Sequence, residues 1–194
     1  MLYLNQSDYP HIPYITQTQN DSVLDKLSSV AKSGCGPCCL CMAVDALTTR
    51  SLSIEECVRL SEDCGANYGP GTDLSMLSPL VAERYGLEYR NTDDQAEMLA
   101  CLQNGGYVVV NVKRQKTDEV GVFTNHGHYI SAIATDGTEV CLLDPSYTPQ
   151  KYHKPGREGK VNDQNAPFLY CHKDILHANT TWILPKYHLF FRKK

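Results

Sequence analysis

An α+β fold is predicted for this chain of 194 residues, because helical and strand patterns occupy different halves of the sequence. Over most of the first hundred residues, apolar side chains recur at helical spacing. After Gly105-Gly106 they form short runs rich in β-branched residues, beginning with Tyr107–Val112. We therefore expect a helical N-terminal half that packs on an antiparallel β-sheet built from the second half.

Five helices are predicted in the first half. Residues 22–32 place their apolar side chains on one helical face, and Pro37–Leu47 is apolar nearly all round, as in a helix buried at the centre of a domain. Polar residues with N-cap character precede the other three helices. These helices begin at Ser53-Ile54-Glu55-Glu56, at Thr72 or Asp73 with an end near Gly86, and at Thr92-Asp93-Asp94-Gln95.

The second half contains further short runs with strand character and one long polar stretch. Pro145–Pro167 carries Pro, Gly, Lys and Asn throughout and predicts a long surface loop, of the kind that often borders a binding site. The remaining strand candidates share β-branched and aromatic residues. They are Val120–Phe123, Tyr129–Thr135, Glu139–Leu143, Thr180–Leu184 and His188–Phe191.

Length, charge and hydropathy favour a single globular domain and argue against a nucleic-acid-binding or membrane protein. The length fits one domain, residues 1–194, with a core of its own. The net charge of −4, and a longest basic block of only Arg192-Lys193-Lys194, argue against a nucleic-acid partner or a polybasic membrane surface. Residues 1–25 lack a signal-peptide pattern and no run of eighteen apolar residues occurs. We expect a cytoplasmic protein with no membrane partner, and no feature of the sequence indicates an oligomeric state.

The nine cysteines favour free thiols over a disulfide framework. Their number is odd, and Cys35, Cys38, Cys39 and Cys41 are too crowded for all of them to find partners at disulfide separation. Free thiols are typical of a reducing compartment.

Cys35 stands in a sequence context that favours a reactive thiol. Pro37 tolerates only the first turn of a helix, so the helix begins close to Cys35. A thiol there faces unpaired N–H groups and the positive end of the helix dipole, which lower its pKa. Gly34 and Gly36 on either side are expected to let a substrate approach the sulfur.

His128 and Asp144 are the predicted partners of this thiol. His128 begins a strand, and Asp144 ends the next one. If Thr135-Asp136-Gly137 forms a three-residue hairpin loop, Ala134 pairs with Thr138 and the two side chains lie directly opposite, with Cβ atoms roughly 5 Å apart. A two-residue turn would instead send them to opposite faces of the sheet.

Together these motifs resemble the C39-like branch of the papain-like cysteine peptidases. The resemblance rests on Gly34-Cys35-Gly36-Pro37 at the start of a buried helix, on Gly127-His128-Tyr129-Ile130, and on Asp144-Pro145. Members of that group also place a glutamine before the nucleophile, often after an aromatic-rich segment such as Pro13-Tyr14-Ile15-Thr16-Gln17.

The resemblance implies a papain-like fold and a thiol-dependent attack on a peptide amide bond. It implies Cys35 as nucleophile, His128 as general base and then acid, and Asp144 as the residue that orients His128. Gln17 is implied as an oxyanion donor. The implied partner is a peptide or protein substrate, and no cofactor or metal is implied. Transfer to an amine, as in the similar phytochelatin synthases, would use the same residues.

Four alternatives remain open at the level of sequence. Cys38 corresponds to the nucleophile if the motif is instead compared with the Cys-Gly-Ser-Cys-Trp signature of papain itself. Gln19 is a substitute for Gln17. The clustered cysteines have Cys-x-x-Cys spacing, which zinc and iron–sulfur sites also use. The fourth alternative is a domain of the same fold that binds peptides without cleaving them.

Overall fold

A computed structural model describes residues 1–16, 28–67, 71–113, 119–181 and 184–193 of the chain. Its described part contains a seven-stranded antiparallel sheet in the order β1-β7-β2-β3-β4-β6-β5. The helices are η1 (Gln6–Asp8), α1 (Val30–Ser33), α2 (Cys35–Leu47), α3 (Ile54–Asp63), α4 (Leu74–Tyr85), α5 (Gln95–Gln103) and α6 (Lys173–Ala178). The strands are β1 (Leu87–Thr92), β2 (Tyr107–Lys113), β3 (Gly127–Thr135), β4 (Glu139–Leu143), β5 (Asn162–Asn165), β6 (Phe168–His172) and β7 (Tyr187–Arg192).

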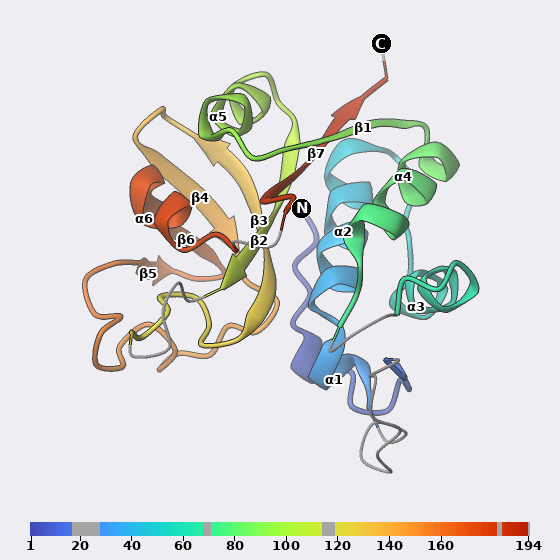
Figure 1. Cartoon of the computed structure of the whole chain (residues 1–194), viewed down its shortest axis with the longest axis horizontal. Helices are drawn as coiled ribbons and strands as arrows, with labels where there is room; N and C mark the ends of the chain where they lie inside the picture. Colours follow the sequence, from blue (N-terminus) through green and yellow to red (C-terminus); the bar gives the residue numbers. More distant parts are fainter. Residues whose placement is uncertain (17–27, 68–70, 114–118, 182–183, 194) are drawn as a thin grey trace.

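Helices cover both faces of the sheet and create two apolar cores (Figure 1). On one face α2 packs against β2, β3 and β7, with α3 and α4 beside it. On the other face α5 and α6 contribute apolar residues to a second core, together with the loop that follows β4. Every residue of α2 from Gly36 to Val44 is buried, as the all-round apolar pattern predicts. The predicted α+β class, with helices packed on an antiparallel sheet, is confirmed.

The N-terminal caps of three helices lie where the polar residues predict them. Ser53 accepts a hydrogen bond from the backbone of Glu56 at 3.1 Å and begins α3. Asp73, rather than Thr72, caps α4, and Asp94, rather than Thr92, caps α5. In both cases the aspartate is the last residue before the helix, so its carboxylate reaches the free N–H groups of the first turn.

Several predicted boundaries are wrong because long-range pairing decides them. The supposedly helical half contains β1, which pairs with the C-terminal strand β7. Val120–Phe123 is not a strand. Of the predicted strand Thr180–Leu184, residues 182 and 183 lie outside the described residues, and Thr180 forms an isolated bridge to Val112. The predicted loop Pro145–Pro167 includes β5, and β6 and α6, for which no prediction was made, follow it.

The helix predicted over residues 22–32 lies partly outside the described residues, which resume at Ser28. Ser29 is extended and bridges Pro13, so the helix begins only at Val30, as α1. An extended residue that pairs with another segment cannot continue a helix, whatever its side-chain pattern.

The hairpin between β3 and β4 differs from the predicted register. Thr135 pairs with Val140, an offset that taken alone would put His128 and Asp144 on opposite faces. A bulge at Ile133 shifts the register by one residue and restores their common face. Continued along the strands, the register places His128 across from Ser146, so the predicted direct opposition of His128 and Asp144 is wrong by two positions.

The N-terminal segment ties the helical layer to the end of β4. Tyr3 donates a hydrogen bond from its hydroxyl to the backbone carbonyl of Asp144 at 2.8 Å, and the backbone N–H of Gln6 donates to that of Pro145 at 2.7 Å. From the same segment, the backbone N–H of Leu2 donates to the carboxylate of Asp45 on α2 at 2.8 Å. These bonds fix the distance between the start of the loop after β4 and helix α2.

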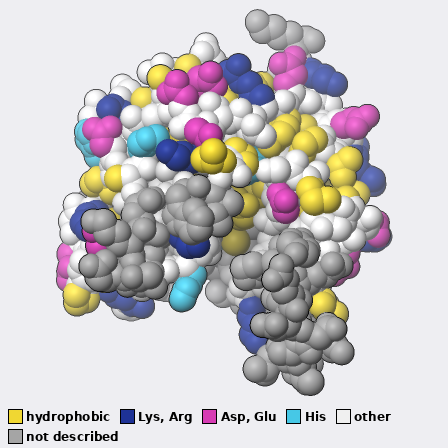
Figure 2. Space-filling view, viewed as in Figure 1, with side chains coloured by type: hydrophobic (Ala, Val, Ile, Leu, Met, Phe, Trp, Pro, Cys, Tyr) yellow, Lys and Arg dark blue, Asp and Glu magenta, His cyan; other side chains and the backbone are white. Residues whose placement is uncertain are grey.

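The surface carries acidic and basic side chains in mixture on the face shown in Figure 2. Among the described residues, no helix combines the length and the apolar character needed to cross a lipid bilayer.

Candidate active site

Cys35 is the first residue of α2, with Pro37 in the first turn as its missing N–H requires. Its side chain is partly exposed, as is that of Cys64, whereas the other seven cysteines are buried. Cys35 is therefore accessible at the end of the helix where the dipole favours a negative charge.

The surroundings of Cys35 favour its thiolate form. Burial raises the pKa of the thiol, but a hydrogen bond with His128 and the charge of that imidazole lower it, and backbone N–H groups of Tyr129 and Gly36 add to the lowering. The net result is a pKa below the ordinary value of a cysteine. A lowered thiol pKa is what a nucleophilic cysteine needs near neutral pH.

His128 connects the thiol to Asp144. Its Nε2 donates to Oδ1 of Asp144 at 2.8 Å, which leaves Nδ1 for Cys35. Burial lowers the pKa of His128, but the charge and hydrogen bond of Asp144, together with its bond to Cys35, raise it above the ordinary value. The predicted contact between His128 and Asp144 is thus present, and both pKa shifts favour a thiolate beside an imidazolium.

Asp144 is fully buried and accepts more hydrogen bonds than the sequence indicates. Besides His128, the backbone and hydroxyl of Ser146 donate to Oδ1 at 2.9 and 3.1 Å. Lys151 and Tyr152 each donate to Oδ2 at 2.5 Å. Burial raises the pKa of Asp144, but the charges of Lys151 and His128 hold it far below the ordinary range, so the carboxylate is ionised.

Sequence reasoning missed Ser146, Lys151 and Tyr152. All three lie within eight residues of Asp144, in the stretch interpreted as a polar surface loop. In the sequence Lys151 is indistinguishable from exposed lysines of the same loop, such as Lys154. Its burial depends on how the loop folds back over the sheet, which no local pattern encodes.

The two glycines beside Cys35 serve packing inside the chain. A Cβ atom on Gly36 would lie 3.0 Å from Cβ of Thr72, and one on Gly34 would lie 2.4 Å from Val30. The hydroxyl of Thr72 is in turn 2.6 Å from that of Tyr14, which holds it in place. These internal contacts account for both glycines, and the expected access of a substrate to the sulfur stays a prediction.

Gly36→Ala is therefore expected to destabilise the fold by about 1–3 kcal/mol, the usual cost of overpacking a tight contact. Gly71→Ala is the matched control, because a Cβ there meets nothing within 4 Å, and its effect should stay within about 0.5 kcal/mol. Urea unfolding followed by circular dichroism measures both. Equal stability of the two variants would contradict the packing role of Gly36.

Cys38, the alternative nucleophile, is fully buried in the core. Burial and the charge of Cys35 raise the pKa of its thiol well above the ordinary value, so a thiolate is disfavoured there. Cys39 and Cys41 are equally buried on the same helix.

Within the described ranges, no group of three or more His, Cys, Asp or Glu side chains is arranged to hold a metal ion.

Gln17 and Gln19, the candidates for the oxyanion donor, lie outside the described residues. Their role stays a prediction.

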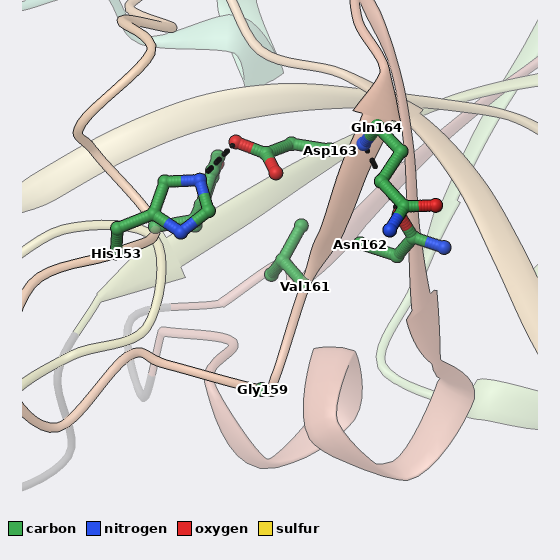
Figure 3. Close-up of a pocket in the computed structure, with 7 residues that line it drawn as sticks. His153, Gly159, Val161, Asn162, Asp163 and Gln164 are labelled. Atoms are coloured by element: carbon green, nitrogen blue, oxygen red, sulfur yellow. Dashed lines mark hydrogen bonds and ion pairs between the residues drawn. The ribbon is translucent and has the colours of Figure 1, made fainter.

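A shallow pocket of about 290 Å³ lies beside the loop that follows β4 (Figure 3). Tyr152 lines it, and His153 binds Asp163 across it at 3.1 Å. None of Cys35, His128 and Asp144 is among its lining residues. The pocket therefore borders the loop that supports Asp144, and it does not contain the thiol.

The comparisons with known proteins bear on the fold. No family model matches the sequence, and no curated protein matches it. The peptidase domain of Streptococcus ComA, a bi-functional ABC transporter involved in a quorum sensing pathway, aligns with a TM-score of 0.50 at 15% identity over 93% of this chain and 100% of that one. A protein described as a C39-like peptidase from Bacillus anthracis aligns with a TM-score of 0.55 at 13% identity over 100% of both chains. The resemblance inferred from the motifs is thus confirmed for the fold, and the chain has the papain-like α+β fold of C39 peptidase domains.

Proposed function

We propose that this chain is a cysteine peptidase or a related thiol acyl-transfer enzyme that acts on a peptide or protein substrate. The observation that carries the proposal is the chain of contacts from a partly exposed thiol at a helix start, through His128, to the buried carboxylate of Asp144. Nucleophile, base and orienting group in this order are the components of thiol acyl transfer.

In the first half of the proposed reaction, the thiolate of Cys35 attacks the amide carbonyl and a carbon–sulfur bond forms. The backbone N–H of Cys35, with the side chain of Gln17 as the predicted second donor, holds the negative oxygen of the tetrahedral intermediate. His128 gives its proton to the amine nitrogen as the carbon–nitrogen bond breaks. A thioester on Cys35 and a free amine result.

In the second half, His128 takes a proton from water, whose oxygen attacks the thioester. The carbon–sulfur bond breaks, the acid is released and the thiolate beside the imidazolium is restored. An amine that reached the thioester before water would give transfer in place of hydrolysis. Asp144 stays ionised throughout and holds the ring of His128 in place.

The test is cleavage of a complex peptide library, read as new termini by mass spectrometry. We expect the wild-type protein to cleave, and Cys35→Ala to lose at least about 10³-fold of the rate. Cys64→Ala is the matched control, because Cys64 is the other partly exposed cysteine, and it should cleave as the wild type does. Absence of cleavage by a folded wild-type protein between pH 5 and 9, or equal cleavage by Cys35→Ala, would overturn the proposal.

A further inference from the structure

A buried lysine contacts Asp144, the carboxylate that binds His128. Lys151 is only 7% exposed, and its Nζ is 2.5 Å from Oδ2 of Asp144 and 2.7 Å from the hydroxyl of Ser146. Lysine is almost never buried unless its charge is paired, because desolvation of an ammonium group is costly. Here it is paired with the same carboxylate that His128 binds through Oδ1.

Lys151 neutralises the negative charge of Asp144, the carboxylate that His128 contacts. Asp144 and Lys151 together carry no net charge, so the four groups Cys35, His128, Asp144 and Lys151 sum to zero both as thiol with imidazole and as thiolate with imidazolium. Without the lysine, the set would carry one negative charge in either state. A buried carboxylate with His128 as its only cationic partner would hold the proton on the imidazole more tightly.

We propose that Lys151 is a positioning residue that neutralises Asp144, so that His128 can both release and regain its proton during the reaction. The inference rests on the proposed function. The Asp144–Lys151 pair would then offer His128 an acceptor close to neutral, comparable with the asparagine of Cys-His-Asn peptidases.

Among the described residues, other titratable or charged groups face this set from several elements. From α2 and β3, Cys38, Cys39 and Tyr129 lie close enough to sense the charge of Cys35. From the N-terminal segment, Tyr3 lies close enough to sense the charge of Asp144. From the loop, Tyr152 donates to Asp144, and burial with the nearby carboxylate raises the pKa of that phenol. Arg157, also buried, donates to the backbone carbonyl of Lys151 at 3.4 Å and opposes the charge of that lysine. Of the described lysines and arginines near this set, Lys151 contacts the carboxylate directly.

The test follows alkylation of Cys35 by iodoacetamide as a function of pH, with the adduct located by mass spectrometry. The rate has two midpoints, one for formation of the thiolate and one for loss of the imidazolium proton, which belong to the coupled pair. In Lys151→Met a cation is lost, so the thiolate is less stabilised and the imidazolium more so. Both midpoints should rise, by about one pH unit.

Asp144→Asn supplies the opposite change, because it leaves the lysine without a counter-ion. Both midpoints should then fall. In the double variant Asp144→Asn/Lys151→Met the set is neutral again, and both midpoints should return toward the wild-type values. The matched control is Lys154→Met, an exposed lysine of the same loop, which should leave the midpoints unchanged.

The outcomes separate the two proposals. A lysine that served only the fold would lower the reactive fraction without moving the midpoints. Unchanged midpoints in Lys151→Met, or a double variant no closer to the wild type than Lys151→Met, would overturn the role of Lys151 while leaving Cys35 as the nucleophile. A wild-type Cys35 that titrates as an ordinary thiol in one step would overturn the proposed function and this inference together.

Discussion

His128→Ala is expected to lower the rate of peptide cleavage by about 10²–10⁴-fold, the usual contribution of a general acid–base group. The loss has two physical sources. The hydrogen bond and charge that lower the pKa of Cys35 disappear, so less thiolate is present near neutral pH. The leaving amine also loses its proton donor.

The loss of thiolate and the loss of the proton donor can be measured separately with His128→Ala. Cleavage of a peptide identified with the wild-type protein reports the whole loss, and alkylation of Cys35 at pH 6 reports the thiolate alone. His126→Ala is the matched control, because His126 is two residues earlier in the chain and exposed. If His126→Ala lost as much activity as His128→Ala, the assignment of the base would be wrong.

Asp144→Ala is expected to cost about 3–5 kcal/mol in the free energy of unfolding, the range found when one partner of a buried ion pair is removed. Lys151 would be left buried without its counter-ion, and His128 and Tyr152 would lose their acceptor. Urea unfolding at pH 7 measures this loss. The remaining folded protein should also cleave more slowly, because nothing orients the ring of His128.

Asp163→Ala is the control for that experiment. Asp163 pairs with the exposed His153 at 3.1 Å and accepts a hydrogen bond from Tyr147 at 3.3 Å, but no buried lysine depends on it. Its removal is therefore expected to cost only about 1–2 kcal/mol. A stability loss for Asp144→Ala no larger than that of Asp163→Ala would show that the buried cluster is not a main source of stability.

The sequence predicts the contact between His128 and Asp144, although the predicted hairpin register is wrong. Side chains alternate between the two faces along each strand, and paired residues share a face. His128 and Asp144 therefore share a face whenever the residue numbers of paired residues on the two strands add up to an even number. The hairpin turn is longer than predicted, and a bulge at Ile133 corrects the parity. Strand pattern alone does not predict a bulge, because one extra residue leaves no strong signature in a run such as Tyr129–Thr135.

Other features of the fold depend on partners distant in sequence. The strand β1 follows α4 directly and forms because β7 pairs with it from the far end of the chain. Caps such as Asp73 and Asp94 are local, and the sequence predicts the start of both helices to within two residues. Lys151 could not be singled out, because only the path of the loop after β4 brings it to Asp144.

The site at which an electrophilic probe modifies the protein decides whether Cys35 is the nucleophile. Wild-type protein and Cys35→Ser are incubated at pH 7 with a peptide-like thiol-directed probe, and the modified residue is located by mass spectrometry. We expect rapid modification of Cys35 in the wild type and almost none in Cys35→Ser. Modification of Cys38, or equal labelling of the two proteins, would contradict it.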